Sequence, residues 1–209
     1  MTASISHEIK NVLAIINETA GLLEDTTLMA EKGKPVDPER IKTLAGKIMN
    51  QVQRADGVVK NMNKFAHGID ETFKVVDIGK TLEFVAALAA RFASMRGVVL
   101  ETELPARPVT INTSPFVLQN LIWLCLDFAM DAAGEGKIVT LIAEETKDGP
   151  RIRFTRLQGL SEAPGDMFPS EQEKALLGLL QAELSADLGA GVILLSLSKD
   201  PGPPKDSNI

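Results

Sequence analysis

Apolar and helix-compatible residues recur with a coiled-coil period through the first part of the chain. In the first stretch they are separated by alternating steps of four and three, at Ile5, Ile9, Val12, Ile16, Thr19 and Leu23. This spacing predicts a helix over about residues 3–30 with one buried face. In a second stretch, predicted helical over about 38–69, similar steps connect Ile41, Ala45, Ile48, Val52, Ala55, Val59, Met62, Ala66 and Ile69.

A short break separates the two predicted helices. Gly33 and Pro35 disfavour helix there, and Asp37 can cap the second helix with Pro38 at its first position. Two long helices joined by a short loop are expected to form an antiparallel hairpin. Because a lone hairpin leaves part of its apolar surface in water, we expect two copies to pack as a four-helix bundle in a homodimer.

After about residue 72 the pattern changes to short alternating segments. Strands are predicted at 73–76, 98–103, 109–112, 137–145, 151–157 and 191–197, and helices at 77–96, 114–133 and 170–184, with a turn at 147–150 and a loop at 159–169. The stretch from Leu121 to Met130 is apolar on almost all sides, which predicts burial against a sheet. The expected fold class is therefore α+β: a helical hairpin in residues 1–72, a two-layer α/β sandwich in residues 73–198 and a disordered tail in residues 199–209.

Composition narrows the classes of function. The chain is 44% hydrophobic and 24% charged with a formal net charge of -6, so neither nucleic acid nor an anionic membrane surface is an expected partner. The single cysteine, Cys125, lies in an apolar run and is predicted to be buried; a reducing cytoplasm fits this usage best. No uncharged apolar run approaches the roughly 20 residues that span a bilayer, so no direct membrane contact is expected.

The chemistry-bearing residues are His7, Glu8 and Asn11 near the start of the first predicted helix. His7 lies midway between two apolar-face residues, so it is expected to point to solvent. A neutral imidazole is nucleophilic near neutral pH, the adjacent Glu8 can orient it, and Asn11 can hold a water or a phosphoryl oxygen one turn away. Most exposed histidines are only solvated, but these neighbours favour phosphoryl chemistry. His67 has no such neighbours, and we expect a surface role or an interaction with the helix dipole.

Two segments carry a family resemblance. The segment 6–11, followed by an apolar face and a second helix, resembles the phosphoacceptor helix of sensor histidine kinases, and the hairpin looks like their dimerisation and phosphotransfer domain. Residues 75–78 are similar to the entry into their ATP-binding domain, and 120–133 looks like the helix of its asparagine motif. The resemblance implies that His7 is phosphorylated, that Glu8 is its acid/base partner, and that Asn11 helps to dephosphorylate a receiver aspartate.

The nucleotide-binding motifs of that family do not carry over. In the alignment, Phe128 stands at the metal-binding asparagine and Leu124 at the asparagine before it, and neither offers an oxygen ligand to magnesium. The adenine-reading aspartate is missing from residues 156–160, where the sequence is Arg-Leu-Gln-Gly-Leu. Residues 173–179 stand in place of the glycine-rich lid. The second domain therefore resembles a degenerate histidine-kinase ATPase domain.

The resulting hypothesis is a histidine phosphotransferase of a bacterial two-component phosphorelay. His7 would accept a phosphoryl group from one response-regulator receiver domain and pass it to another, with no tightly bound cofactor and with Mg²⁺ supplied by the receiver. The alternatives are a sensor histidine kinase fragment with an atypical ATP site, a non-catalytic dimeric scaffold, and a receiver phosphatase that uses Glu8 and Asn11.

Overall fold

The computed structural model describes residues 2–70, 73–162 and 168–199, without the side chains of residues 2–8 and 61–70. The chain forms two compact units, Met1–Ala66 and His67–Ile209. The division after residue 72 that the sequence suggests stays a prediction. The predicted disordered tail lies, beyond residue 199, outside the described residues. No helix in the described ranges is both long enough and apolar enough to cross a bilayer.

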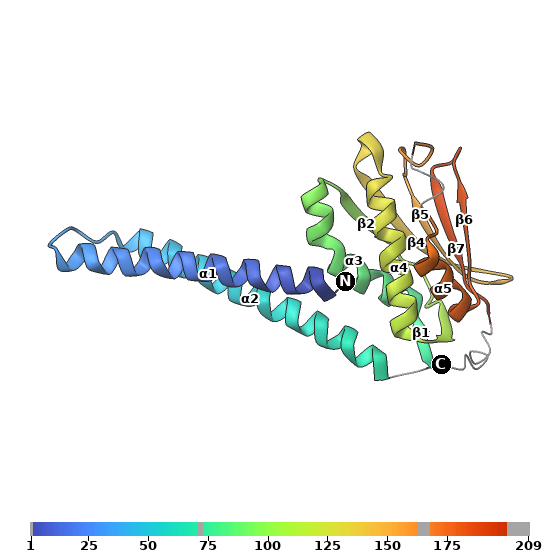
Figure 1. Ribbon diagram of the computed structural model, residues 1–209, viewed down its shortest axis with the longest axis horizontal. Coiled ribbons are helices and arrows are strands. Elements are labelled where there is room, and N and C mark those ends of the chain that lie inside the picture. The colour runs from blue at the N-terminus through green and yellow to red at the C-terminus, as the bar shows by residue number, and fades with distance from the viewer. Residues whose placement is uncertain (1, 71–72, 163–167, 200–209) are drawn as a thin grey trace. The chain divides into compact units, whose positions relative to one another are not determined.

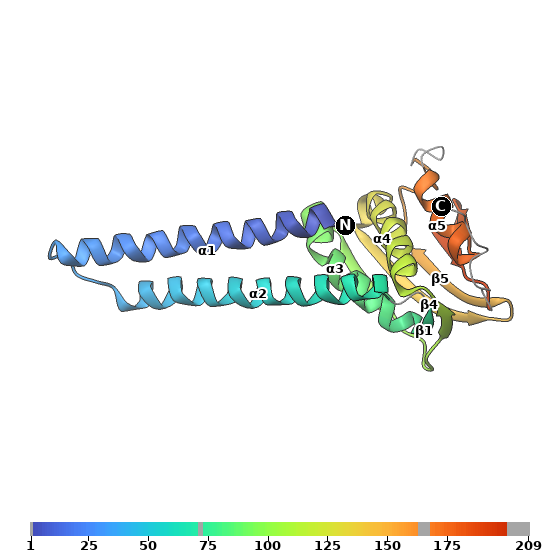
Figure 2. The same ribbon diagram turned by 60° about the horizontal axis from the view of Figure 1, so that its bottom comes forward.

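Helices α1 (Thr2–Glu31) and α2 (Pro38–Asp70) form the predicted antiparallel hairpin (Figures 1 and 2). The predicted apolar face of α1 is confirmed, because Val12 and Thr19 are buried and the other described members of the series are half-buried. The hydroxyl of Thr19 donates to the carbonyl of Ile15 at 2.7 Å, which satisfies it inside the interface. The Asp37 carboxylate accepts from the Glu39 N–H at 3.0 Å, so the predicted cap of α2 is also confirmed.

The buried face of α2 agrees with the predicted one only in part: Ala45, Ile48 and Ala55 of the predicted series are half-buried. Leu44, which was not part of the predicted series, is 6% exposed. Ile41, Val52 and Val59, which were part of it, remain 36%, 52% and 39% exposed. The apolar stripe of α2 is wider than the area that one partner helix can cover, so a single hairpin leaves these side chains in contact with water.

The second unit has a five-stranded mixed sheet. Its strand order is β2 (Val99–Glu103), β4 (Ile138–Thr146), β5 (Gly149–Thr155), β7 (Val192–Ser196) and β6 (Glu183–Asp187), with β2–β4 parallel and the other pairs antiparallel. Helices α3 (Ile78–Arg96), α4 (Pro115–Asp131) and α5 (Glu171–Leu180) cover one face of this sheet (Figures 1 and 2). Strands β1 (Lys74–Asp77) and β3 (Thr110–Thr113) form a separate antiparallel pair. The predicted α+β architecture is confirmed.

The core of this unit lies between the sheet and α4. The sheet contributes fully buried Leu141, Ile152, Phe154 and Leu195, and α4 contributes fully buried Leu118, Leu121, Ile122 and Leu126. This confirms the burial predicted for the apolar stretch of residues 121–130. Asp77 caps α3 as predicted, accepting from the Lys80 N–H at 3.2 Å, and the left-handed Gly97 ends the helix.

The predicted helix over 170–184 is too long. It ends at Leu180, and Gln181 takes a left-handed conformation with φ of 49°. The next residues form strand β6, in which Leu184 lies opposite Leu195 of β7. The segment Glu-Leu-Ser-Ala-Asp has no strong strand preference of its own, and its extended conformation depends on backbone pairing with a strand that follows in the chain.

Candidate functional site

The phosphoryl-transfer residues expected from the sequence lie on α1. His7 and Glu8 are within the helix, but their side chains lie outside the described part of the structure. Asn11 is exposed. The side chain of His67, on α2, is likewise outside the description. The catalytic roles of His7, Glu8 and Asn11 therefore stay predictions.

The face of α1 that follows Asn11 is open. Ala14 and Glu18 are exposed, and a Cβ added at Gly21 would meet nothing within 4 Å. By the helical period, position 7 lies one turn before Asn11 on this same face. A partner could thus approach α1 over the exposed residues Asn11, Ala14 and Glu18.

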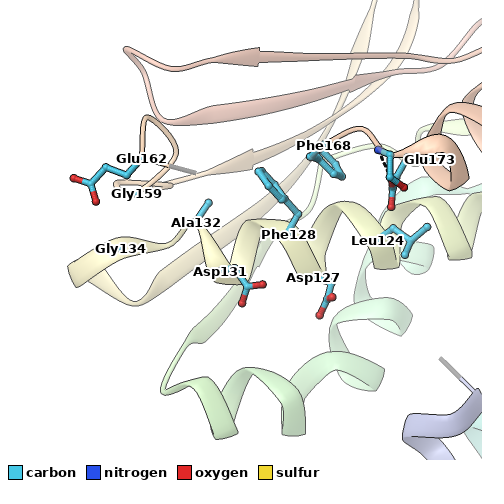
Figure 3. Close-up of a pocket in the computed structure, with 11 residues that line it drawn as sticks. Leu124, Asp127, Phe128, Asp131, Ala132, Gly134, Gly159, Glu162, Phe168 and Glu173 are labelled. Carbon is cyan, nitrogen blue, oxygen red and sulfur yellow. Dashed lines mark hydrogen bonds between the residues drawn. The ribbon is translucent and has the colours of Figure 1, made fainter. Parts of the chain in front are cut away.

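A second feature is a cavity of about 600 Å³ in the unit that contains the sheet. Four segments surround it: α4, the turn after α4, the loop after β5, and the start of α5 (Figure 3). The lining residues are Leu124, Asp127, Phe128, Asp131, Ala132, Gly134, Gly159, Glu162, Phe168, Ser170 and Glu173. Both positions that align with the kinase asparagines, Leu124 and Phe128, therefore line this cavity.

Two aromatic rings stack at the centre of this lining. The rings of Phe128 and Phe168 have centroids 4.2 Å apart and planes inclined by 6° (Figure 3). A planar ring inserted between them would need about 3.5 Å on each side, so none can enter this gap. The sequence alone gave no sign of this pair, because the two residues belong to different elements.

The charged groups around the cavity are carboxylates. Arg96, from the last turn of α3, donates to Asp127 through Nη1 at 2.8 Å and pairs with Asp131 through Nε at 3.2 Å. In Figure 3 the carboxylates of Asp127 and Asp131 point away from the two phenylalanine rings. No lysine or arginine is among the described residues that line the cavity.

Glu173 is a buried carboxylate that orders the start of α5. Its Oε2 accepts from the Ser170 N–H at 2.7 Å, and the Ser170 hydroxyl accepts from the Gln172 N–H at 3.2 Å. The two residues form a capping box. Sequence reasoning identified Ser170 as a cap but missed its partner; the three-residue spacing from serine to glutamate was the available signal.

The segment expected to replace the adenine-reading motif has structural contacts of its own. Arg156 has a φ of 69° and lies 3.5 Å from the Glu101 carboxylate, and Leu157 is buried. The Gln158 side-chain oxygen accepts from the Gly136 N–H at 2.9 Å, which connects this loop to the turn after α4. Nothing in these contacts requires a nucleotide.

Cys125 is buried in α4, as predicted. Burial, and secondly the charge of Glu173, raise the pKa of the Cys125 thiol well above its ordinary value. The thiol is therefore held in its neutral form and acts as a small apolar side chain. The described part of the chain contains no group of three His, Cys, Asp or Glu side chains that could hold a metal ion.

Comparison with known proteins gives structural matches only. No family model and no curated protein matches the sequence. Among solved structures, the histidine kinase AdeS of Acinetobacter baumannii is 14% identical, with a TM-score of 0.52 and coverage of 92% of this chain and 98% of that one. The catalytic domain of the histidine kinase ThkA is 10% identical, with a TM-score of 0.51 and coverage of 63% of this chain and 100% of that one. The chain therefore has a histidine-kinase-like fold, with two N-terminal helices followed by an ATPase-like α/β domain.

Proposed function

We propose that this chain is a histidine phosphotransferase that relays a phosphoryl group through His7 between receiver-domain aspartates. The observation that carries the proposal is the lining of the cavity in the ATPase-like domain. Stacked phenylalanine rings and carboxylates form part of this lining, and its described residues include neither a basic side chain nor an asparagine. A nucleotide triphosphate is a polyanion whose magnesium requires oxygen ligands. Asp127 and Asp131 are already paired with Arg96, and no lysine or arginine among the described lining residues could neutralise the phosphates.

The proposed reaction needs little from the protein beyond positioning. A ring nitrogen of His7 attacks the phosphorus of a receiver aspartyl phosphate; a nitrogen–phosphorus bond forms and the bond to the aspartate oxygen breaks. The second receiver aspartate then attacks the phosphorus and releases the imidazole. By resemblance to histidine kinases, Glu8 stabilises the imidazolium charge that develops. Magnesium would come with the receiver domain. The open face around Asn11 and Gly21 would leave room for the receiver domain to dock.

We also propose that the hairpin forms a homodimer. Ile41, Val52 and Val59 share one face of α2 and are 36%, 52% and 39% exposed in the single chain. A second hairpin packed on this face would cover them and complete a four-helix bundle. The two His7 sites of such a dimer would lie on separate copies of α1.

A second candidate is an ATP-dependent histidine kinase. The comparisons favour it more directly, because the similar structures are a histidine kinase and a kinase catalytic domain. In that case the nucleotide would have to bind without the rings of Phe128 and Phe168 staying in their stacked arrangement, since these occupy the centre of the cavity lining.

One experiment separates the two candidates. Receiver domains phosphorylated with labelled acetyl phosphate are mixed with the full chain, and label on the chain is followed with time. We expect transfer to the wild type and to His67→Ala, but none to His7→Ala. In parallel, the chain is incubated with labelled ATP and Mg²⁺. Label on His7 from ATP would establish the kinase instead. Loss of receiver phosphate without labelling of His7, slowed by Asn11→Ala, would indicate a phosphatase. If the chain neither takes up label nor changes the phosphorylation of any receiver, the remaining alternative is a non-catalytic scaffold.

A further inference from the structure

Strand β2 has a free edge. It pairs with β4 on one side, and no strand in the described part of the chain pairs with its other side. The Val99 N–H donates to the Lys137 carbonyl at 2.8 Å, on the β4 side. Because backbone groups alternate in direction along a strand, the N–H and C=O groups of Leu100 and Thr102 point to the free edge. These groups can accept another strand.

A groove runs along this edge. It is formed by α3 and by the side chains of Leu100 and Thr102, and it encloses about 340 Å³. On the helix side its wall consists of Ala86, Ala90 and Ala93, which share one face of α3. We call this depression the edge groove. Alanines keep the helix surface low beside the strand, so side chains of an added strand would have space between the two elements.

The surroundings of the edge groove are acidic. Glu83 lines it on the α3 side, and Glu103 at the end of β2 is exposed on the other face of the strand, because Leu100 and Thr102 turn their side chains to the groove. Neither makes an ion pair with a residue that the structure describes. Glu101 lies on the same face of β2 as Glu103 and contacts Thr140, at 3.2 Å, and Arg156, at 3.5 Å. A strand added here would meet carboxylates on its exposed side.

These charges argue against two occupants from the same kind of chain. A second copy that paired β2 with β2 would bring Glu101 and Glu103 close to their own equivalents, and like charges on paired strands repel. Within the chain itself, the segment Pro-Gly-Pro-Pro at 201–204 has only one N–H group in four residues, too few for strand pairing. A partner of opposite charge fits better.

We propose that the edge groove binds an extended segment of another protein by strand addition, and that this segment alternates small apolar residues with lysine or arginine. The main-chain groups of Leu100 and Thr102 would pair with the added strand, which is a known mode of peptide recognition. Its apolar side chains would lie against Ala86 and Ala90, and its basic side chains, on the opposite face of the added strand, would lie near Glu101 and Glu103. This binding site is independent of phosphoryl transfer through His7.

The test uses the full chain and two synthetic hexapeptides, one with alternating lysine and valine and one with alternating glutamate and valine. Binding is followed by fluorescence anisotropy of labelled peptide at physiological salt. We expect the lysine peptide to bind at least about tenfold more tightly than the glutamate peptide. In the complex, hydrogen exchange at the Leu100 and Thr102 amides should slow. N-methylation of the lysine peptide, which removes its backbone donors, should abolish binding.

A pair of matched variants tests the groove itself. Ala90→Leu fills the groove at an exposed helical position, and we expect it to weaken binding of the lysine peptide about tenfold. Ala175→Leu makes the same change at an exposed position of α5 and should have no effect. Equal affinity for both peptides, slowed exchange in β6 instead of β2, or unchanged binding to Ala90→Leu would each overturn the proposal. Dimerisation of the chain through β2 would also overturn the proposal. It would be detected as a molecular mass in solution that is lower for Ala90→Leu than for the wild type.

Discussion

Replacement of Val52 by glutamate should break the proposed homodimer. Val52 is 52% exposed in the single hairpin and lies between Ile41 and Val59 on the apolar face of α2. Full burial of such a side chain is worth about 1.5–3 kcal/mol, so burial of the remaining half contributes about 0.8–1.5 kcal/mol. A twofold dimer contains the residue twice, and the substitution therefore removes about 1.6–3 kcal/mol, or roughly 15- to 150-fold in the dissociation constant.

Two further effects act in the same direction. The glutamate carboxylate would have to leave water in the bundle, and its twofold copy would lie across the same interface, so the loss should exceed the apolar estimate. Because the position is exposed within one hairpin, the fold of the single chain should survive. Circular dichroism should show unchanged helix content.

The assay is sedimentation equilibrium over a series of protein concentrations. Leu22→Glu is the matched control: Leu22 is 39% exposed, the same as Val59, but lies on the face of α1 that carries Asn11 and Glu18. We expect the control to remain a dimer and Val52→Glu to become a monomer. A wild-type mass of one chain at every concentration, or equal weakening by both substitutions, would refute the reasoning.

Three further predictions concern the ATPase-like domain. Phe154→Ala, at a fully buried position of β5, should lower the free energy of unfolding by about 3–5 kcal/mol, measured by urea denaturation. Ser170→Ala removes half of the capping box of α5 and should cost about 1 kcal/mol, seen as a lower melting temperature; an unchanged value would mean that Glu173 alone orders this turn. The raised pKa of Cys125 predicts that the native thiol resists alkylation at pH 8 and reacts after denaturation. Because the pKa of Cys125 in the folded state lies above the ordinary value of 9.0, its contribution to the free energy of unfolding should be constant below pH 9.0 and should fall above it. In urea titrations, Cys125→Ala should not show this loss of stability at high pH.

Whether the ATPase-like domain can bind a nucleotide triphosphate depends on contacts that join distant parts of the chain. Sequence comparison placed Leu124 and Phe128 at the kinase asparagines, and the structure places both in the wall of one cavity. It also adds Phe168, whose ring stacks on Phe128 from the segment before α5. The apolar substitution at position 128 is thus matched by a second aromatic residue about forty positions later, which supports a cavity adapted to something other than a triphosphate.

The sequence by itself determined the features that depend on neighbours within a helical turn or two. The alternating four- and three-residue steps predicted the face of α1 that buries Val12 and Thr19, and the caps at Asp37 and Asp77 formed as expected. Such features follow from local backbone geometry, because side chains three and four apart share a face and a capping side chain reaches only the next turn.

The tertiary structure decided what depends on the partner that each segment meets. Strand β6 exists because β7 offers it backbone hydrogen bonds, although its own residues would suit a helix. On α2, packing against α1 selected Leu44 and left Val52 exposed, a choice that periodicity could not make because the apolar stripe is broader than one interface. The contacts of Arg96 with Asp127 and of Phe128 with Phe168 likewise join residues that only folding brings together. Sequence patterns record which residues seek burial or a charge partner, and the packing of whole elements determines which of them find one.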